Sequence, residues 1–158
     1  MMTGHLTLAL IKPHIVRERK VGQIINMIEE AEFGILLAKN LMLRPEGIHE
    51  FYKEHIGKEF FNNILMTMSA GPLWALVLGK PNAVEEWRNL IGSTHPAEAA
   101  PGTIRNLFGY HTNTEYNAVH GSDSDEAALR EISFFFSWEI SLALKTEEFD
   151  KEPKIEGK

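Results

Sequence analysis

The chain has 158 residues, 44% of them hydrophobic and 24% charged, as in a single globular domain with a full core. A formal net charge of -6 argues against a protein that coats nucleic acid, and no apolar run reaches the roughly 18 residues of a membrane span. The lack of cysteine excludes disulfides and thiol chemistry and fits a reducing compartment. With no signal-like leader, we expect a cytoplasmic protein.

The first quarter of the chain predicts one strand and one helix. Residues 6–11 are a short apolar run that ends at Lys12, before a proline, which predicts a buried strand with a lysine at its carboxyl end. Residues 14–20 are polar and are expected to form a loop. Apolar residues with helical spacing over 21–31 then predict an amphipathic helix, with Gly34 as its stop.

The middle of the chain predicts two further strands around a helical hairpin. Residues 35–43 read as the second strand, and 46–53 and 59–68 as two short helices. Residues 73–78 give the clearest strand of the chain, because glycine and proline bound it on both sides.

The last part of the core predicts a helix, a long loop, a short strand and a final helix. Asn82 stands three residues before Glu85, a variant of the capping box that opens a helix. Residues 92–116 lose helical periodicity and are expected to form one long loop, of the kind that is usually functional or disordered. Residues 118–119 would be a last strand and 125–136 a helix.

This order of elements fits an α/β (α+β) ferredoxin-like sandwich, in which helices cover a four-stranded antiparallel sheet. Periodicity alone leaves a parallel sheet open. We place a single domain at 1–145. Residues 146–158 alternate in charge and have almost nothing to bury, so we expect a disordered tail there.

The chemistry centres on residues 117–124, Asn-Ala-Val-His-Gly-Ser-Asp-Ser. The apolar pair before His120 predicts a strand end, Gly121 allows the backbone to turn, and the oxygen-bearing residues 122–124 are good N-caps for the helix that follows. A histidine at such a corner can move a proton, bind a metal or act as a nucleophile. Taken alone, the histidine of a His-Gly pair is more often an ordinary loop residue. The choice between that interpretation and a reactive histidine therefore depends on the rest of the sequence.

Any phosphate site in this chain must be built from side chains, because the phosphate loop, the dinucleotide fingerprint and the hydrolase elbow are all absent. The candidate groups stand at the ends of elements or in the long loop, and each alone fits a solvated polar group. They are the cations Lys12, Arg88 and Arg105, the hydroxyl of Thr94, and the amide of Asn117, which suits ribose hydroxyls.

Several blocks of sequence, in order, resemble the nucleoside diphosphate kinase family along nearly the whole ordered length. They include Leu-Ala-Leu-Ile-Lys-Pro at 8–13, Ser-Ala-Gly-Pro at 69–72, Pro-Gly-Thr-Ile-Arg at 101–105 and His-Gly-Ser-Asp-Ser at 120–124. The resemblance implies a ferredoxin-like fold and a ping-pong reaction that balances nucleotide pools. In it, His120 takes the γ-phosphoryl group of a nucleoside triphosphate such as ATP and passes it to a diphosphate such as GDP.

The resemblance also implies roles for individual residues. Glu131 would accept a hydrogen bond from the His120 ring, with Ser122 nearby. The residues that match the family's phosphate-binding positions are Lys12, Arg88, Thr94 and Arg105, and Tyr52 matches the phenol near the transferred group. The base would stack on Phe60, with Ile64 one helical turn further on, while Lys12 and Asn117 contact the sugar. Mg²⁺ would be held chiefly by nucleotide and water, and Asp123 could reach it through water.

Departures from the family pattern define the open points. His14-Ile15 replace the usual aspartate and small residue, and the segment between Arg105 and His120 is longer and leaves the residue that covers the base unassigned. The charged tail replaces the family's C-terminal extension. The resemblance implies a homo-oligomer, and the loop at Pro96 favours a hexamer over a tetramer. The alternative is an inactive member that serves as a regulatory scaffold; nucleic-acid binding has the acidic charge against it.

Overall fold

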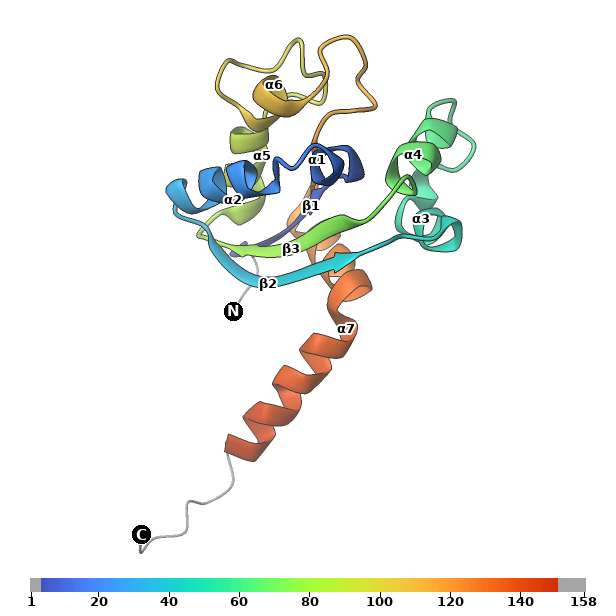
Figure 1. Ribbon diagram of the computed structural model, residues 1–158. Helices are drawn as coiled ribbons and strands as arrows, with labels where there is room; N and C mark the ends of the chain where they lie inside the picture. Colours follow the sequence, from blue (N-terminus) through green and yellow to red (C-terminus); the bar gives the residue numbers. More distant parts are fainter. Residues whose placement is uncertain (1–3, 151–158) are drawn as a thin grey trace, which may run out of the picture.

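One antiparallel sheet forms the centre of the computed structural model, which describes residues 4–150 and, from 143 onward, the backbone alone (Figure 1). Its strands lie in the order β2-β3-β1-β4. They are β1 (Leu6–Ile11), β2 (Gly34–Leu41), β3 (Leu73–Gly79) and β4 (Val119–Gly121). Every pairing is antiparallel. The ferredoxin-like sandwich predicted from the order of elements is therefore confirmed, and the parallel alternative is excluded.

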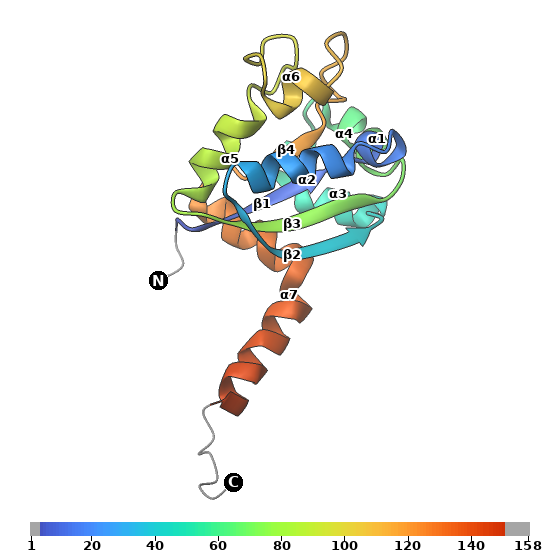
Figure 2. The same ribbon diagram turned by 60° about the vertical axis from the view of Figure 1, so that its left-hand side comes forward.

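Helices cover both faces of the sheet, because the central strand is apolar on both sides (Figure 2). In β1, Leu8 and Leu10 face one layer and Ala9 and Ile11 the other, as the two-residue period of a strand requires. The first layer contains α3 (Pro45–Phe51), α4 (Phe61–Met68) and the start of α7 (Asp125–Asp150), with a short 3₁₀ turn at Lys53–His55. The second contains α1 (Pro13–Arg17), α2 (Val21–Glu30), α5 (Ala83–Ile91) and α6 (Ile104–Phe108).

Two segments expected to be loops contain helices instead. The polar stretch after β1 forms α1, since Pro13 is pre-organised for the first helical position and both His14 and Ile15 are buried. The long loop over 92–116 is interrupted by α6, where Ile104 is fully buried. In both cases tertiary burial overrides a local pattern that is too short to show helical periodicity.

Two predicted helix-boundary signals are wrong. After α2, the left-handed residue is Glu32, with φ of 67°, while Gly34 already begins β2. At the start of α5, Asn82 itself has φ of 59°, and its side-chain amide donates to the Glu85 carboxylate at 3.0 Å instead of accepting a backbone N–H. The helix α5 thus begins without the predicted capping box.

The helix α7 is longer than predicted and bends at Phe136, whose φ and ψ are -126° and 24°. Its start follows the sequence signal, since the Ser124 hydroxyl accepts from the Ala127 backbone N–H at 3.1 Å. At the bend, Lys39 Nζ from β2 donates to the Phe135 carbonyl at 2.9 Å and pairs with Glu139 at 2.5 Å. Beyond it the helix projects from the body (Figure 1).

The predicted disordered tail overlaps this helix. Residues 146–150 continue α7, and residues 151–158 lie outside the described part of the chain. Within residues 4–150, no helix combines the length and the apolar character needed to cross a membrane.

Gly121 is required for close packing and not for the turn that its position in the sequence suggested. It lies inside β4 opposite Ala9, whereas the residue with positive φ is Ala118, at 75°. A Cβ added at Gly121 would lie 2.9 Å from Cδ1 of the fully buried Trp87. The Trp87 ring therefore occupies the space that a side chain at position 121 would need.

We expect Gly121→Ala to lower the free energy of unfolding by about 1–3 kcal/mol, because the buried Trp87 must move to admit the methyl group. Urea denaturation measures this. Gly22→Ala is the matched control: it adds the same methyl group in α2, where no heavy atom lies within 4 Å of the new Cβ, so stability should be unchanged or slightly higher. Equal effects of the two changes would contradict the packing role.

Candidate active site

His120 lies in the middle of β4 and pairs with Leu10 of the central strand. Its ring packs against the edges of Phe51 and Tyr52, with centroid distances of 5.4 and 6.1 Å. Nε2 lies 2.5 Å from Glu131 Oε1, and the side chain is 20% exposed. Since the carboxylate holds Nε2 as a hydrogen-bond donor, Nδ1 is the ring nitrogen left with a free lone pair.

A short chain of hydrogen bonds fixes Glu131, which is itself buried. Its Oε1 accepts from the Ser122 hydroxyl at 3.3 Å, and the Ser122 oxygen accepts from the Leu8 backbone N–H at the same distance. Ser122 is fully buried. The orientation of His120 is thereby tied to the central strand β1, as is typical of an imidazole that must present one nitrogen.

Lys12 and Asn117 meet directly although 105 positions separate them in the sequence. Lys12 Nζ donates to Asn117 Oδ1 at 2.6 Å, and Asn117 Nδ2 donates to the Thr94 carbonyl at 3.1 Å. Burial, and secondarily the charge of Arg105, lower the pKa of Lys12 to about 7. This ammonium group has no carboxylate partner among the described residues, so a bound anion would stabilise its charged form.

Arg105 is a second cation, whose hydrogen bonds within the described part of the chain all go to backbone carbonyl groups. It donates to the carbonyls of Gly92 at 3.1 Å and Val119 at 3.0 Å, while its buried Nε has no partner among the described residues. Burial, then the charge of Arg88, lower its pKa to about 10. Arg88 is more exposed and donates to the Asp123 carbonyl at 3.2 Å. The cleft therefore holds an excess of positive charge.

Tyr52 keeps its proton throughout the physiological range. Burial, followed by the nearby charge of Glu131, raises the pKa of its phenol well above the ordinary value. Its ring stands edge-on to His120. A neutral phenol is available there as a hydrogen-bond donor to a negatively charged group.

These side chains surround one cleft of about 1130 Å³. The predicted residues that line it are Lys12, Tyr52, Phe60, Ile64, Arg88, Thr94, Arg105, Asn117, His120 and Asp123. Ser122 and Glu131 do not line it and stand behind the His120 ring. Phe60, which is 47% exposed, is the N-cap residue of α4, and Ile64 lies within that helix. Together they form an apolar end of the cleft. The structure therefore gathers the predicted residues from segments spread over most of the described chain.

The segment between Arg105 and His120, left unassigned by the sequence, contributes polar residues to the cleft. They are Thr114, Glu115 and Asn117, and Val119, next to His120, is the apolar residue of this segment that lines the cleft. The Thr114 hydroxyl lies 3.0 Å from His95 Nδ1, which links this segment to the loop after α5. Among residues 106–117, the side chains that line the cleft are therefore polar.

A strained turn at Ala118 is the main feature that the sequence did not reveal. Its φ of 75° and the hydrogen bond from the Val119 N–H to the Asn117 carbonyl, 2.9 Å, are those of a γ-turn with positive φ, a rare and strained form. Such strain costs on the order of 1–3 kcal/mol and is concentrated at functional sites. Alanine carries no signal for positive φ, so no sequence pattern could have predicted it.

The acidic residues of the cleft suit a metal held mostly by its substrate. Among residues 4–142, no three or more acidic, histidine or cysteine side chains gather to hold an ion. Asp123 stands beside Arg88 with 89% of its side chain exposed. Mg²⁺ keeps several waters and binds through one or two carboxylates plus substrate phosphates, so this donor set fits it.

An anchored imidazole facing buried cations, on an antiparallel sandwich, defines a nucleotide-binding phosphotransferase. The chain belongs to the nucleoside diphosphate kinase family, whose model matches residues 5–140. Its activity is that of the family, the transfer of the γ-phosphoryl group of a nucleoside triphosphate to a nucleoside diphosphate.

Relatives and solved structures agree with this assignment. A nucleoside diphosphate kinase of Pasteurella multocida (strain Pm70) is 46% identical over 135 residues, 85% of this chain and 96% of the relative. The crystal form C222 of the Aquifex aeolicus enzyme has a TM-score of 0.80 at 36% identity, covering 84% of this chain and 94% of that one. The Halobacterium salinarum enzyme in complex with CDP also has a TM-score of 0.80, at 33% identity, with 84% and 88% covered.

We expect nucleotide binding at pH 8 to take up protons through Lys12. At this pH the free side chain is mostly neutral, because its pKa is about 7, and a bound phosphate raises that pKa again. Calorimetry with a nucleoside diphosphate, in two buffers of different ionisation enthalpy, should show uptake on the order of half a proton more than in Lys12→Gln. The difference should vanish near pH 5.5, where Lys12 is already protonated. No difference at pH 8 would contradict the lowered pKa.

Proposed function

We propose that His120 is the nucleophile of a ping-pong nucleoside diphosphate kinase reaction and that its Nδ1 carries the phosphoryl group. In the first half, the Nδ1 lone pair forms a bond to the γ-phosphorus, the bond to the bridging oxygen breaks, and the nucleoside diphosphate leaves. In the second half, a terminal oxygen of another diphosphate attacks this phosphorus and the N–P bond breaks. The observation that carries the proposal is the 2.5 Å contact of Nε2 with Glu131, which leaves Nδ1 free.

Glu131 has an electrostatic task in this scheme. When Nδ1 becomes bonded to phosphorus, the ring gains positive character, and the adjacent carboxylate stabilises the Nε2–H that remains. Ser122, donating to the same oxygen, keeps the carboxylate in place.

The phosphate chain is held by the cations of the cleft, in roles proposed for Lys12, Arg88 and Arg105, with Thr94 and the Tyr52 hydroxyl as neutral donors. The unpartnered Nε of Arg105 supports this, since a phosphate oxygen would satisfy it. Mg²⁺, when bound, would neutralise charge on the phosphates, and Asp123 would hold it through water.

Recognition of the nucleoside would be broad. We place the sugar at the Lys12–Asn117 pair and the base on the exposed ring of Phe60, beside Ile64. Stacking tolerates every base because all present a π-face. The polar Thr114 and Glu115 add no apolar wall that would select one ring size.

The proposal extends to assembly and location. We infer a homo-oligomer, a hexamer in preference to a tetramer, and a cytoplasmic enzyme that acts on soluble nucleotide pools. Large apolar side chains exposed away from the cleft, at Leu36, Met42 and Trp138, support an association of copies. The kinase domain is placed within residues 1–145. The scaffold alternative has no specific observation in its favour, because the cleft groups converge on His120.

We expect the protein, incubated with γ-labelled ATP and Mg²⁺, to acquire phosphate that is labile in acid and stable in base, as on a histidine. The label should move to added GDP. It should be absent from His120→Ala, while His95→Ala, a change in an exposed histidine of the loop after α5, should retain it. If the wild-type protein acquires no label, the result would favour the scaffold alternative.

We expect Phe60→Ala to raise the KM for every nucleoside diphosphate by roughly tenfold, since stacking contributes about 1–3 kcal/mol per base, and to leave kcat within about threefold. Steady-state kinetics with purine and pyrimidine diphosphates measure both constants. Phe60→Tyr, which keeps the aromatic face, is the control. An unchanged KM in Phe60→Ala would refute the stacking role.

A further inference from the structure

His14 contacts the turn that carries Asn117. Its side chain is 3% exposed, in the first turn of α1, and no step proposed above uses it. Its Nε2 accepts a hydrogen bond from the Ala118 backbone N–H at 3.0 Å, across 104 positions of sequence. A buried imidazole thus reaches from α1 to the chain that enters β4.

The Ala118 turn is held from both sides. Its N–H donates to His14, and its carbonyl accepts from the Lys12 backbone N–H at 2.9 Å. Ala118 is fully buried, so loss of the imidazole acceptor would leave an unpaired N–H in a strained turn. Asn117, whose side chain lies 2.6 Å from Lys12 Nζ, is the residue whose carbonyl closes this turn.

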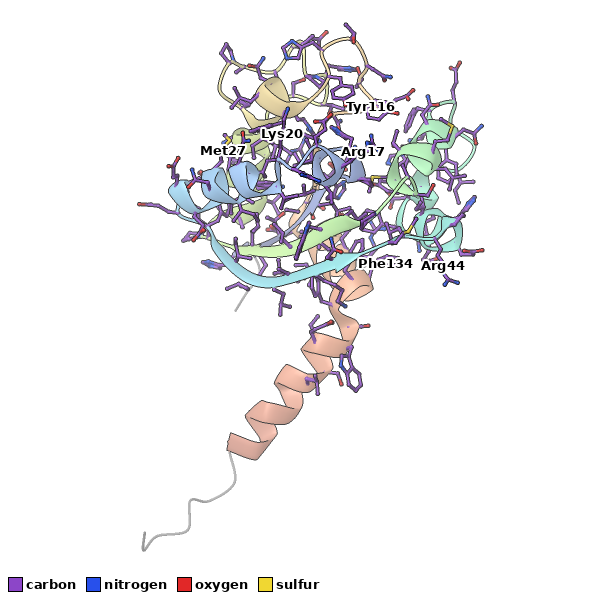
Figure 3. All side chains as sticks on the ribbon, in the orientation of Figure 1. Arg17, Lys20, Met27, Arg44, Tyr116 and Phe134 are labelled. Atoms are coloured by element: carbon purple, nitrogen blue, oxygen red, sulfur yellow. The ribbon has the colours of Figure 1, made fainter. Side chains whose placement is uncertain are left out.

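Two tyrosines extend the same attachment to the loop that lines the cleft. The rings of Tyr110 and Tyr116 stack at 5.0 Å, and each lies edge-on to His14, at 5.2 and 5.4 Å. The Tyr110 N–H donates to the Tyr116 carbonyl at 2.8 Å, and the Tyr110 hydroxyl donates to the Glu18 carboxylate. Figure 3 shows Tyr116 above α1, on the side of the cleft loops.

We propose that His14 is a positioning residue for nucleotide binding, the neutral acceptor that fastens the Ala118 turn and the loop over 110–116. Through them it sets where Asn117 and Lys12 meet the sugar. The proposal rests on the sugar-binding role proposed above for that pair.

Only the neutral ring can accept the Ala118 hydrogen bond, and the surroundings keep it neutral. Burial, as the largest cause, lowers the pKa of His14 from 6.5 to about 4. The charged groups facing it are Glu18, which raises the pKa, and Lys12, Arg17 and Lys20, which lower it. The phenols of Tyr110 and Tyr116 complete its surroundings.

The sign of the pH effect follows from these values. Between pH 6.5 and about 4 the unfolded chain binds a proton at His14 that the folded chain does not. The stability that the neutral ring contributes is therefore complete above pH 6.5 and is lost as the pH falls toward 4.

The test compares His14→Gln, whose amide oxygen can reach the place of Nε2 and cannot titrate, with His14→Leu, which has no acceptor. We expect His14→Leu to raise the KM for ADP about tenfold at pH 7.5, with kcat within about threefold, because a buried N–H loses its partner. His14→Gln should stay within about twofold of wild type. As the pH falls from 6.5 to 4, the wild-type melting temperature should drop further than that of His14→Gln, and its KM should rise more near pH 4, where the folded ring begins to take up a proton.

The opposite results overturn the proposal. They are a folded His14→Leu protein with the wild-type KM, or a His14→Gln protein with the same response to acid as wild type. If His14→Leu does not fold, the acid response of His14→Gln decides alone. Equilibrium dialysis of ADP on each variant separates this proposal from the phosphohistidine mechanism, since binding is measured without turnover. If His120 acquires no label but ADP binding still depends on His14, only the phosphohistidine mechanism is refuted.

Discussion

Buried positive charge that has no carboxylate partner among the described side chains is the constraint on which this site depends. Lys12 and Arg105 give their hydrogen bonds to an amide oxygen and to backbone carbonyls, and burial lowers the pKa of both. A fold that holds two such cations near each other loses stability, because each is removed from water without a counter-ion. A bound polyphosphate would supply the negative charge that these buried cations lack. The electrostatics of the site therefore favour the form with bound phosphate over the form without it.

The ferredoxin-like sheet places these cations beside His120. Because β4 pairs antiparallel with β1, His120 stands opposite Leu10, two residues before Lys12. The strand β4 has only three residues, so its position depends on what holds its two ends. The strained turn at Ala118 stands at one end, and the Ser122–Glu131 hydrogen bonds at the other. Small changes at either end would move the imidazole.

The two ends of the cleft also differ in how firmly they are built. Around His120 the side chains are buried and fixed by short contacts, as phosphoryl transfer requires when catalysis is mostly positioning. At the end of the cleft that Phe60 lines, this ring is half exposed, and the loop before β4 contributes the polar residues Thr114 and Glu115 to the lining. This division fits an enzyme that must treat every nucleoside alike while holding every phosphate chain in one geometry.

The sequence by itself determined the strands and the longer helices and predicted His120 as the reacting group, because strong periodicity and the His-Gly-Ser-Asp-Ser block are local signals. It did not determine α1, α6 or the length of α7, whose short or mixed patterns form helix only through burial against the sheet. Nor could it show that His14 accepts from Ala118, or that Gly121 makes room for Trp87. Those contacts join segments far apart in the chain, and only the tertiary structure decides which distant atoms meet.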